Sequence, residues 1–336
     1  MAQSAAVVAG MCAALIFVPL ALAQAPAPLA KPVSARISAP VSPSTATYVV
    51  PRTSFGQPSL EGVWTSNFIL PLESTPQTPM LTLPEPAAKM MAAAYANIVA
   101  NILDKQLDPE IPVLIKSTDG LAIVRGERRT RMVVLPADGK IPWTAEGKKE
   151  AAKGPGMGDF NNPEERPNWE RCVASMGRPP IAATGESNPR QIIQSPTQVV
   201  IHTEYGDEAR IIPFTNQHQP KMFNSALGDA IAHWDGDTLV VETVGMPEND
   251  RVRLFPTIIV SNEAKVIERM TRISDRELLY QFTVEDPKVY AAPWLAEFSI
   301  YRTDQRMFEH ACHEGNYSLP NILRGQRIAD TRSAKP

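Results

Sequence analysis

The densest group of chemically competent side chains lies near the end of the chain, at positions 309–314, which read Glu-His-Ala-Cys-His-Glu. Two histidines three residues apart meet on one face of a helix, and with a nearby carboxylate they are the residue types that hold zinc. The pattern over 307–312 instead predicts a strand, in which His310 and Cys312 share one face and His313 points to the other. The sequence therefore argues against a metal site, and it predicts no cofactor.

His313 and Glu314 form the better pair for acid–base chemistry. A histidine at the end of a strand titrates near neutral pH, and an adjacent carboxylate orients its ring or raises its pKa. The alternative is a histidine at the rim that only hydrogen-bonds a loop carbonyl. Three further residues are candidates for the same chemistry: His218, Glu204 and Glu242.

Several carboxylates and guanidinium groups are embedded in apolar strands, and strand alternation decides which of them point inward. An inward carboxylate without a partner is costly, and its pKa rises, whereas an outward one is solvated. In the strand that carries Glu242, both faces have apolar residues, so the pattern does not decide whether this glutamate points inward or outward. An inward arginine clamps a substrate carboxylate with two hydrogen bonds or pairs with an internal glutamate. The candidate ligand-contacting residues are Trp64, Arg129, Arg171, Arg210 and Trp234.

Two cysteines remain after the N-terminal apolar segment, Cys172 and Cys312. In an exported chain they are expected to form a disulfide. It would close a loop of about 140 residues and contribute roughly 4–5 kcal/mol if loop entropy dominates. The alternatives are a free thiolate nucleophile or a metal ligand.

The N-terminus predicts export. Residues 5–22 are apolar, and Ala21-Leu22-Ala23 before Gln24 fits a signal-peptidase site, so 1–23 is expected to be a signal peptide. Because no Lys or Arg precedes the apolar run, an uncleaved membrane anchor is the alternative. Residues 24–59, rich in Pro, Ala and Ser, predict a disordered leader. The protein is accordingly expected in the periplasm or outside the cell.

The charge balance excludes some partners. The chain has 33 basic and 36 acidic residues, a net charge of −3, and no basic tract, so neither nucleic acid nor an anionic membrane is expected to bind. Once the signal is removed, no stable membrane insertion is expected. The composition is 43% hydrophobic and supports a sizeable core. A single domain over 60–330 is predicted.

The stretch 198–314 must position the candidate residues, and it reads as one strand after another. Hairpin patterns occupy 198–213, 264–285 and 294–312, and an Asp-Gly turn at 233–237 precedes a strand over 238–244. About eight strands at short spacing predict a mainly β fold, an antiparallel up-and-down barrel. A helical insertion is expected near 84–105, with short helices at 144–152 and 319–327.

Five motifs carry a resemblance to a known family. They lie at 129–142, 170–172, 233–243, 282–287 and 311–317. Over roughly 62–327 the chain resembles a family of secreted, largely uncharacterised bacterial proteins, from which no reaction can be transferred. That family usually has Arg where this chain has His233. A wider similarity to lipocalin-like barrels rests on Gly62-x-Trp64, whose Trp closes the barrel floor, and on the succession of strands.

These observations leave three functional hypotheses. The leading one is an exported protein that binds one small, partly apolar molecule inside the barrel. The second is an enzyme that uses the same pocket for acid–base chemistry, as an isomerase, lyase or hydrolase. The third is a structural or envelope-interaction protein whose barrel is filled by its own side chains.

Overall fold

The computed structural model describes residues 48–66, 68, 70–103, 120–152, 162–163, 166, 170–173, 176–181, 188–220, 225–247, 250–252 and 258–333. The expected signal peptide and most of the expected leader lie outside these residues.

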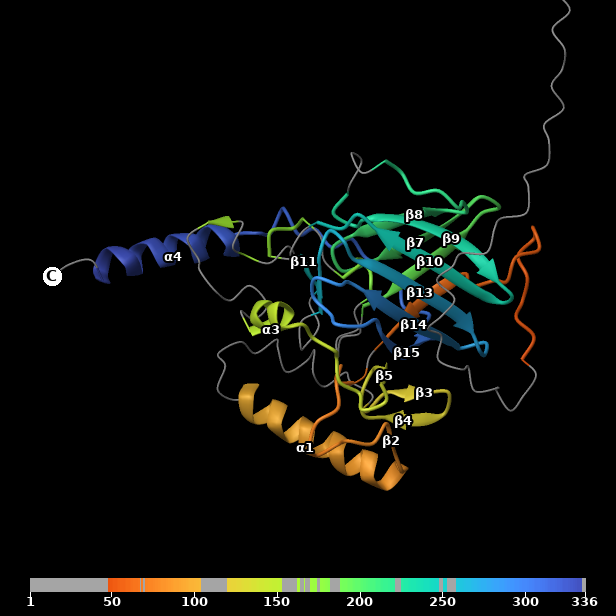
Figure 1. Cartoon of the computed structure of the whole chain (residues 1–336), viewed down its shortest axis with the longest axis horizontal. Coiled ribbons are helices and arrows are strands. Elements are labelled where there is room, and N and C mark those ends of the chain that lie inside the picture. The colour runs from red at the N-terminus through yellow and green to blue at the C-terminus, as the bar shows by residue number, and fades with distance from the viewer. Residues whose placement is uncertain are drawn as a thin grey trace, which may run out of the picture. The chain divides into compact units, whose positions relative to one another are not determined.

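The fold is mainly β, and its central element is a nearly closed barrel of nine antiparallel strands in the order β8-β7-β6-β1-β15-β14-β13-β10-β9 (Figure 1). The end strands β8 and β9 meet through one parallel bridge between Phe214 and Ala232. The lipocalin-like barrel predicted from the sequence is therefore confirmed. The strands are β1 Gly62–Thr65, β6 Arg190–Gln194, β7 Gln198–Thr203, β8 Glu208–Pro213, β9 Asp229–Asp235, β10 Thr238–Val244, β13 Lys265–Arg272, β14 Glu277–Glu285 and β15 Trp294–Arg302.

Smaller elements accompany the barrel. Strand β5 (Val133–Leu135) adds to β15, while β2 (Thr82–Leu83), β4 (Glu127–Arg129) and β3 (Ile123–Val124) form a three-stranded sheet, and β11 (Asp250–Val252) pairs with β12 (Ile258–Val260). The described helices are α1 (Glu85–Leu103), α3 (Ala145–Ala152) and α4 (Ser318–Ser333). None of these helices is both long and apolar enough to cross a membrane.

Three of the hairpins follow the turn chemistry of the sequence. β9 and β10 reverse at Gly236, whose φ is +60°, and β7 and β8 reverse at Gly206, whose φ is +94°. β13 and β14 pair as predicted. The predicted strand over 306–312 is wrong, because described residues 303–311 belong to no strand. Both edges of β15 are already paired, one with β14 and the other with β1 and β5, so no edge is left for a further strand.

The barrel interior is packed with side chains. Tyr280 and Phe298 lie 5.0 Å apart, and Phe282 and Trp294 lie 5.6 Å apart between ring centroids, and all four are fully buried. Trp64 is also fully buried, donates from Nε1 to the Leu60 carbonyl at 2.9 Å, and lies under the Arg272 guanidinium. Each such ring contributes about 1.5–3 kcal/mol by leaving water. These rings belong to one continuous apolar cluster.

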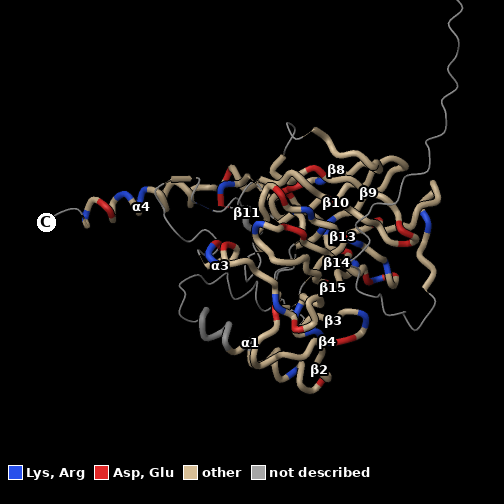
Figure 2. Tube along the Cα trace, viewed as in Figure 1, with Lys and Arg blue, Asp and Glu red and all other residues tan. Residues whose placement is uncertain are grey.

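The end of the expected leader belongs to the folded body. Arg52 forms an ion pair with Asp237 at 2.7 Å, the Tyr48 hydroxyl donates to Asp275 at 3.0 Å, and Val50 is buried. Residues 48–52 of the expected leader are therefore held against the barrel. Figure 2 shows basic and acidic residues interspersed along the barrel strands.

Candidate functional site

A pocket of about 250 Å³ lies at one end of the barrel, which we call the mouth pocket. Its walls come from three segments that are far apart in the sequence: 172–173, the β7–β8 turn at 205–208, and 309–314. The lining residues are Cys172, Val173, Tyr205, Gly206, Asp207, Glu208, Glu309, His310, Ala311, Cys312, His313 and Glu314. Trp64 and Arg272 lie toward the opposite end of the barrel, where the β13–β14 turn is found.

The segment 309–314 is held in place by contacts with the β7–β8 turn. The Phe308 amide donates to the Glu204 carboxylate at 2.8 Å. The His310 ring packs on the Tyr205 ring, with centroids 4.4 Å apart. Because described residues 303–311 lack strand partners, these contacts and the disulfide position the pocket wall.

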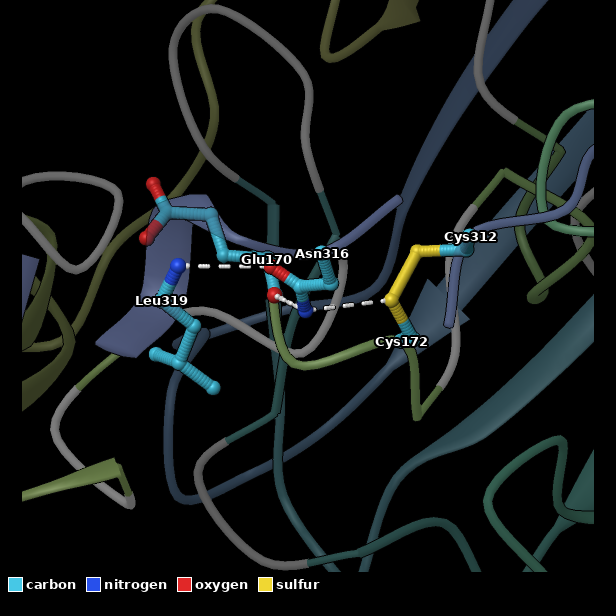
Figure 3. Close-up of a disulfide and its surroundings, with 5 residues drawn as sticks. All are labelled: Glu170, Cys172, Cys312, Asn316 and Leu319. Atoms are coloured by element: carbon cyan, nitrogen blue, oxygen red, sulfur yellow. Dashed lines mark hydrogen bonds between the residues drawn. A yellow bond between two sulfur atoms is a disulfide. The ribbon is translucent and has the colours of Figure 1, made fainter. Parts of the chain in front are cut away.

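The disulfide between Cys172 and Cys312 confirms the predicted pairing; the Cα atoms are 5.8 Å apart across 140 residues of chain. Asn316 joins this disulfide to α4 (Figure 3). Its Nδ2 donates to the Glu170 carbonyl at 2.8 Å and to Cys172 Sγ at 3.3 Å, while its Oδ1 accepts from the Leu319 amide at 3.3 Å.

Acidic groups dominate the mouth pocket. Four lining residues are Asp or Glu, two are His, and none of the described lining residues is Lys or Arg. Asp207 Oδ1 accepts from His202 Nε2 at 2.8 Å, and Glu208 Oε2 accepts from the Gly177 amide at 2.6 Å. Walls of one charge sign concentrate counter-ions, so the pocket favours a cation.

The segment 176–181 inserts into the barrel beneath this pocket, and all its residues are buried. The Ile181 amide donates to the Tyr280 hydroxyl at 2.7 Å in the barrel interior. Gly177 lies against Glu208, so the inserted segment touches a wall of the mouth pocket. We call residues 176–181 the plug.

Three arginines are buried in this region: Arg178 belongs to the plug, Arg190 to β6 and Arg210 to β8. Burial lowers the pKa of Arg178 and of Arg190 to about 10, against the opposing effect of Glu208 on Arg178 and of Tyr280, Glu268 and Glu208 on Arg190. Arg210 differs. Burial lowers its pKa too, but the Glu268 carboxylate attracts it and accepts two of its N–H groups, one of them at 3.0 Å. The effect of Glu268 outweighs burial, so the pKa of Arg210 is raised.

The carboxylate of Glu268 organises this interior cluster. It is fully buried and also accepts from the Tyr280 hydroxyl at 2.7 Å. Burial, followed by the charge of Glu268, raises the pKa of Tyr280 well above its ordinary value. Glu268 thus faces the barrel interior. Its burial is tolerated because the carboxylate has hydrogen-bonding and charged partners there.

The structure brings only some of the sequence-predicted site residues together. His313 and Glu314 line the mouth pocket, and Glu204 holds its wall. Arg171 precedes the disulfide cysteine Cys172 but is not one of the lining residues.

The remaining candidates lie elsewhere. Arg210 belongs to the interior cluster, and Trp64 is part of the core. Trp234 is partly buried on β9, 6.2 Å from the Phe214 ring where the barrel closes. Arg129 lies outside the barrel, paired at 3.0 Å with buried Glu297, and so attaches the three-stranded sheet to β15.

His218 and Glu242 form a separate cluster on the outer face of the barrel. His218 Nδ1 contacts Asp229 at 2.8 Å, and its Nε2 contacts Glu242 at 3.3 Å. Lys265 lies 3.6 Å from Glu242. The neighbours of Glu242 on β10 are inward-facing and fully buried, which settles that this glutamate faces outward.

Sequence reasoning missed Tyr205, Glu208, Arg178, Arg190 and Tyr280. Tyr205 was assigned only to a turn, and the strand that carries Arg190 was not predicted. Period-two alternation over 190–194 would have placed Arg190 on the face of Ile192. Within the part of the chain that the structure describes, no group of three or more His, Cys, Asp or Glu side chains is arranged to hold a metal ion.

Comparisons with known proteins add little to this geometry. No family model matches the chain, and no curated protein matches it, so the resemblance to secreted bacterial proteins stays a prediction. A solved structure of a secretary abundant heat soluble (SAHS) protein from Ramazzottius varieornatus is similar in part, with 8% identity and a TM-score of 0.19. The similarity covers 41% of this chain and 87% of that one, and it carries no argument about function.

Proposed function

We propose that this protein is an exported binding protein that takes one small, partly apolar, positively charged molecule into the mouth pocket. The observation that carries the proposal is the composition of the pocket walls, in which four carboxylates adjoin Val173, Tyr205 and Ala311. The ammonium group of the ligand would face the carboxylates, and its apolar part would lie against Val173, Tyr205 and Ala311.

The size and position of the pocket support a small ligand. Its volume of about 250 Å³ lies just below the range of roughly 300–1,000 Å³ typical of drug-sized sites. The plug and the aromatic core occupy the barrel beneath it, so we place the ligand at the mouth and not at the centre. The Tyr205 ring is already stacked on His310, so it presents a pre-ordered face at little entropic cost.

The direct test uses ligands that share one frame and differ in charge: phenethylamine, 2-phenylethanol and 3-phenylpropionate. Thermal unfolding is measured with each, because a ligand of the native state at a hundredfold excess over Kd adds about 2.7 kcal/mol. We expect the amine to raise Tm and the carboxylate to leave it unchanged. Equal shifts, or a preference for the carboxylate, would contradict the proposal.

Matched variants locate the binding site. Glu314→Gln removes a pocket carboxylate and Tyr205→Ala removes the apolar face, and both are expected to weaken the amine-induced shift. Glu61→Gln removes an exposed carboxylate just before β1 and is expected to leave the shift intact.

An acid–base enzyme is the second candidate, because His310 and His313 both line the pocket beside Glu314. Such an enzyme would convert a bound amine by isomerisation, elimination or hydrolysis. Any ligand that raises Tm is therefore followed for turnover in the natural protein and in His313→Ala. Binding without turnover would support the binding protein and count against the enzyme.

The export proposal has its own test. If 1–23 is a signal peptide, the protein isolated from the periplasm or medium begins at Gln24. Intact mass of the exported protein measures this, and a retained N-terminus in a membrane fraction would favour the anchor instead.

A further inference from the structure

We infer that the Cys172–Cys312 disulfide is a thiol-exchange site, in which a small thiol enters the mouth pocket, bonds to Cys312 and releases Cys172 as a thiolate. The inference rests on the pocket geometry and not on the identity of the ligand proposed above.

The disulfide is open to the pocket. Both cysteines are among its lining residues, and both are partly exposed, in contrast to the buried plug four residues beyond Cys172. A small thiolate in the pocket can therefore approach the sulfur atoms without unfolding of the barrel. Access of this kind is a condition for exchange in a native protein.

Asn316 sets the direction of the exchange. Its amide orientation follows from its three contacts, because the oxygen accepts from the Leu319 amide and the nitrogen must donate to the Glu170 carbonyl. The same nitrogen donates to Cys172 Sγ at 3.3 Å (Figure 3). A donor at this sulfur favours its thiolate, and the sulfur with the more stable thiolate is the better leaving group.

The reaction balances without an added oxidant. The incoming thiolate forms a bond to Cys312 Sγ, the disulfide bond breaks, and its electron pair stays on Cys172 Sγ beside the Asn316 amide. A second thiolate can then attack the external sulfur of the mixed disulfide. The two external thiols are thereby oxidised to a disulfide, and both cysteines are reduced.

Exchange would remove the covalent restraint on the pocket wall. Described residues 303–311 belong to no strand, so after exchange non-covalent contacts, among them those with Glu204 and Tyr205, hold segment 309–314. The plug keeps its own contacts, Gly177 with Glu208 and Ile181 with Tyr280. Exchange is therefore expected to loosen the wall of the mouth pocket while the plug stays in the barrel.

Pocket charge predicts the class of thiol. The four lining carboxylates favour a cationic aminothiol over a mercaptocarboxylate. The probes are therefore 2-aminoethanethiol, 2-mercaptoethanol and mercaptoacetate, which are compared at equal thiolate concentrations because the thiolate is the attacking species.

The experiment follows the oxidised full-length protein with each thiol in the absence of any amine ligand, so that it is independent of the binding proposal. Acid-quenched samples are measured by intact mass and peptide mapping. We expect the adduct on Cys312, a free thiol on Cys172, and the fastest reaction with 2-aminoethanethiol. In denaturant the charge preference is expected to disappear.

Variants separate the role of Asn316 from general destabilisation. Asn316→Ala is expected to slow adduct formation about threefold or more, because the leaving thiolate loses its donor. Asn321→Ala, at an exposed position of α4 close to Asn316 in sequence, is expected to react like the natural protein, and Tm is recorded for both variants. An adduct mainly on Cys172, no reaction of the native protein, or an unchanged rate in Asn316→Ala would each overturn the inference.

Discussion

Replacing Glu268 by Gln is expected to lower the free energy of unfolding by about 3–5 kcal/mol, the range for breaking a buried ion pair. The side chain of Glu268 is fully buried and accepts from both Arg210 and the Tyr280 hydroxyl. Glu268 also acts electrostatically on Arg190, which is itself buried. The substitution therefore leaves two guanidinium groups without this counter-charge.

Replacing the partner, Arg210, should lower the free energy of unfolding by less. In Arg210→Met the Glu268 carboxylate keeps the Tyr280 hydroxyl at 2.7 Å and the attraction of Arg190. The carboxylate thus retains one donor and one nearby cation, whereas the arginines in Glu268→Gln retain neither this charge nor its full set of acceptors. We expect Glu268→Gln to be the more destabilising variant.

Urea unfolding at neutral pH, with the disulfide oxidised, measures the difference. A loss of 3–5 kcal/mol corresponds to a fall in Tm of about 10 °C for a domain of this size. Glu61→Gln, at an exposed position, is the control and should change little. A loss below about 1 kcal/mol for Glu268→Gln, as for an exposed pair, or a larger loss for Arg210→Met, would refute the reasoning.

Three further predictions follow from the core and its attachments. Burial raises the pKa of Tyr280, Tyr290 and Tyr301. Their contribution to stability is therefore fully present below about pH 10, the ordinary pKa of tyrosine in the unfolded chain. It is lost as the pH rises further, because the unfolded chain then releases these protons more readily than the folded protein. Tyrosinate absorbance should rise together with alkaline unfolding, and Tyr290→Phe should make stability fall less steeply with pH. Glu297→Gln should cost about 3 kcal/mol in urea unfolding, because buried Arg129 then keeps only the largely exposed Glu127 of its two described carboxylate partners and Arg125 also loses Glu297. Replacing both cysteines by Ser should lower stability by up to about 4–5 kcal/mol, measured against the oxidised protein, and a loss below about 1 kcal/mol would show that the loop is ordered without the bond.

Local patterns predicted the strands β7, β8, β10, β13, β14 and β15, because a hairpin is specified by neighbouring residues. The Asp-Gly turn at 235–236 reverses β9 into β10, and the β-branched runs around Tyr205-Gly206-Asp207 form β7 and β8. The face of each side chain was harder to predict. Glu242 and Glu268 each follow an apolar residue in a strand, yet one faces outward to His218 and the other inward to Arg210. The partner that decides each face lies 24 or 58 residues away.

The segment 303–314 shows why the site itself could not be predicted in full. Its residues 306–312 have strand-like composition, but β15 already has partners along both edges, so the chain leaves the sheet after Arg302. The disulfide then takes Cys312 to Cys172, and the wall of the mouth pocket forms against a turn about a hundred residues earlier in the sequence. The residue types in 309–314 indicated a candidate site, and the segment does line the mouth pocket, but its surroundings depend on which sheet edges are free. The wall of this pocket is therefore positioned by the disulfide and by side-chain contacts with the β7–β8 turn, and not by the hydrogen bonds of a sheet.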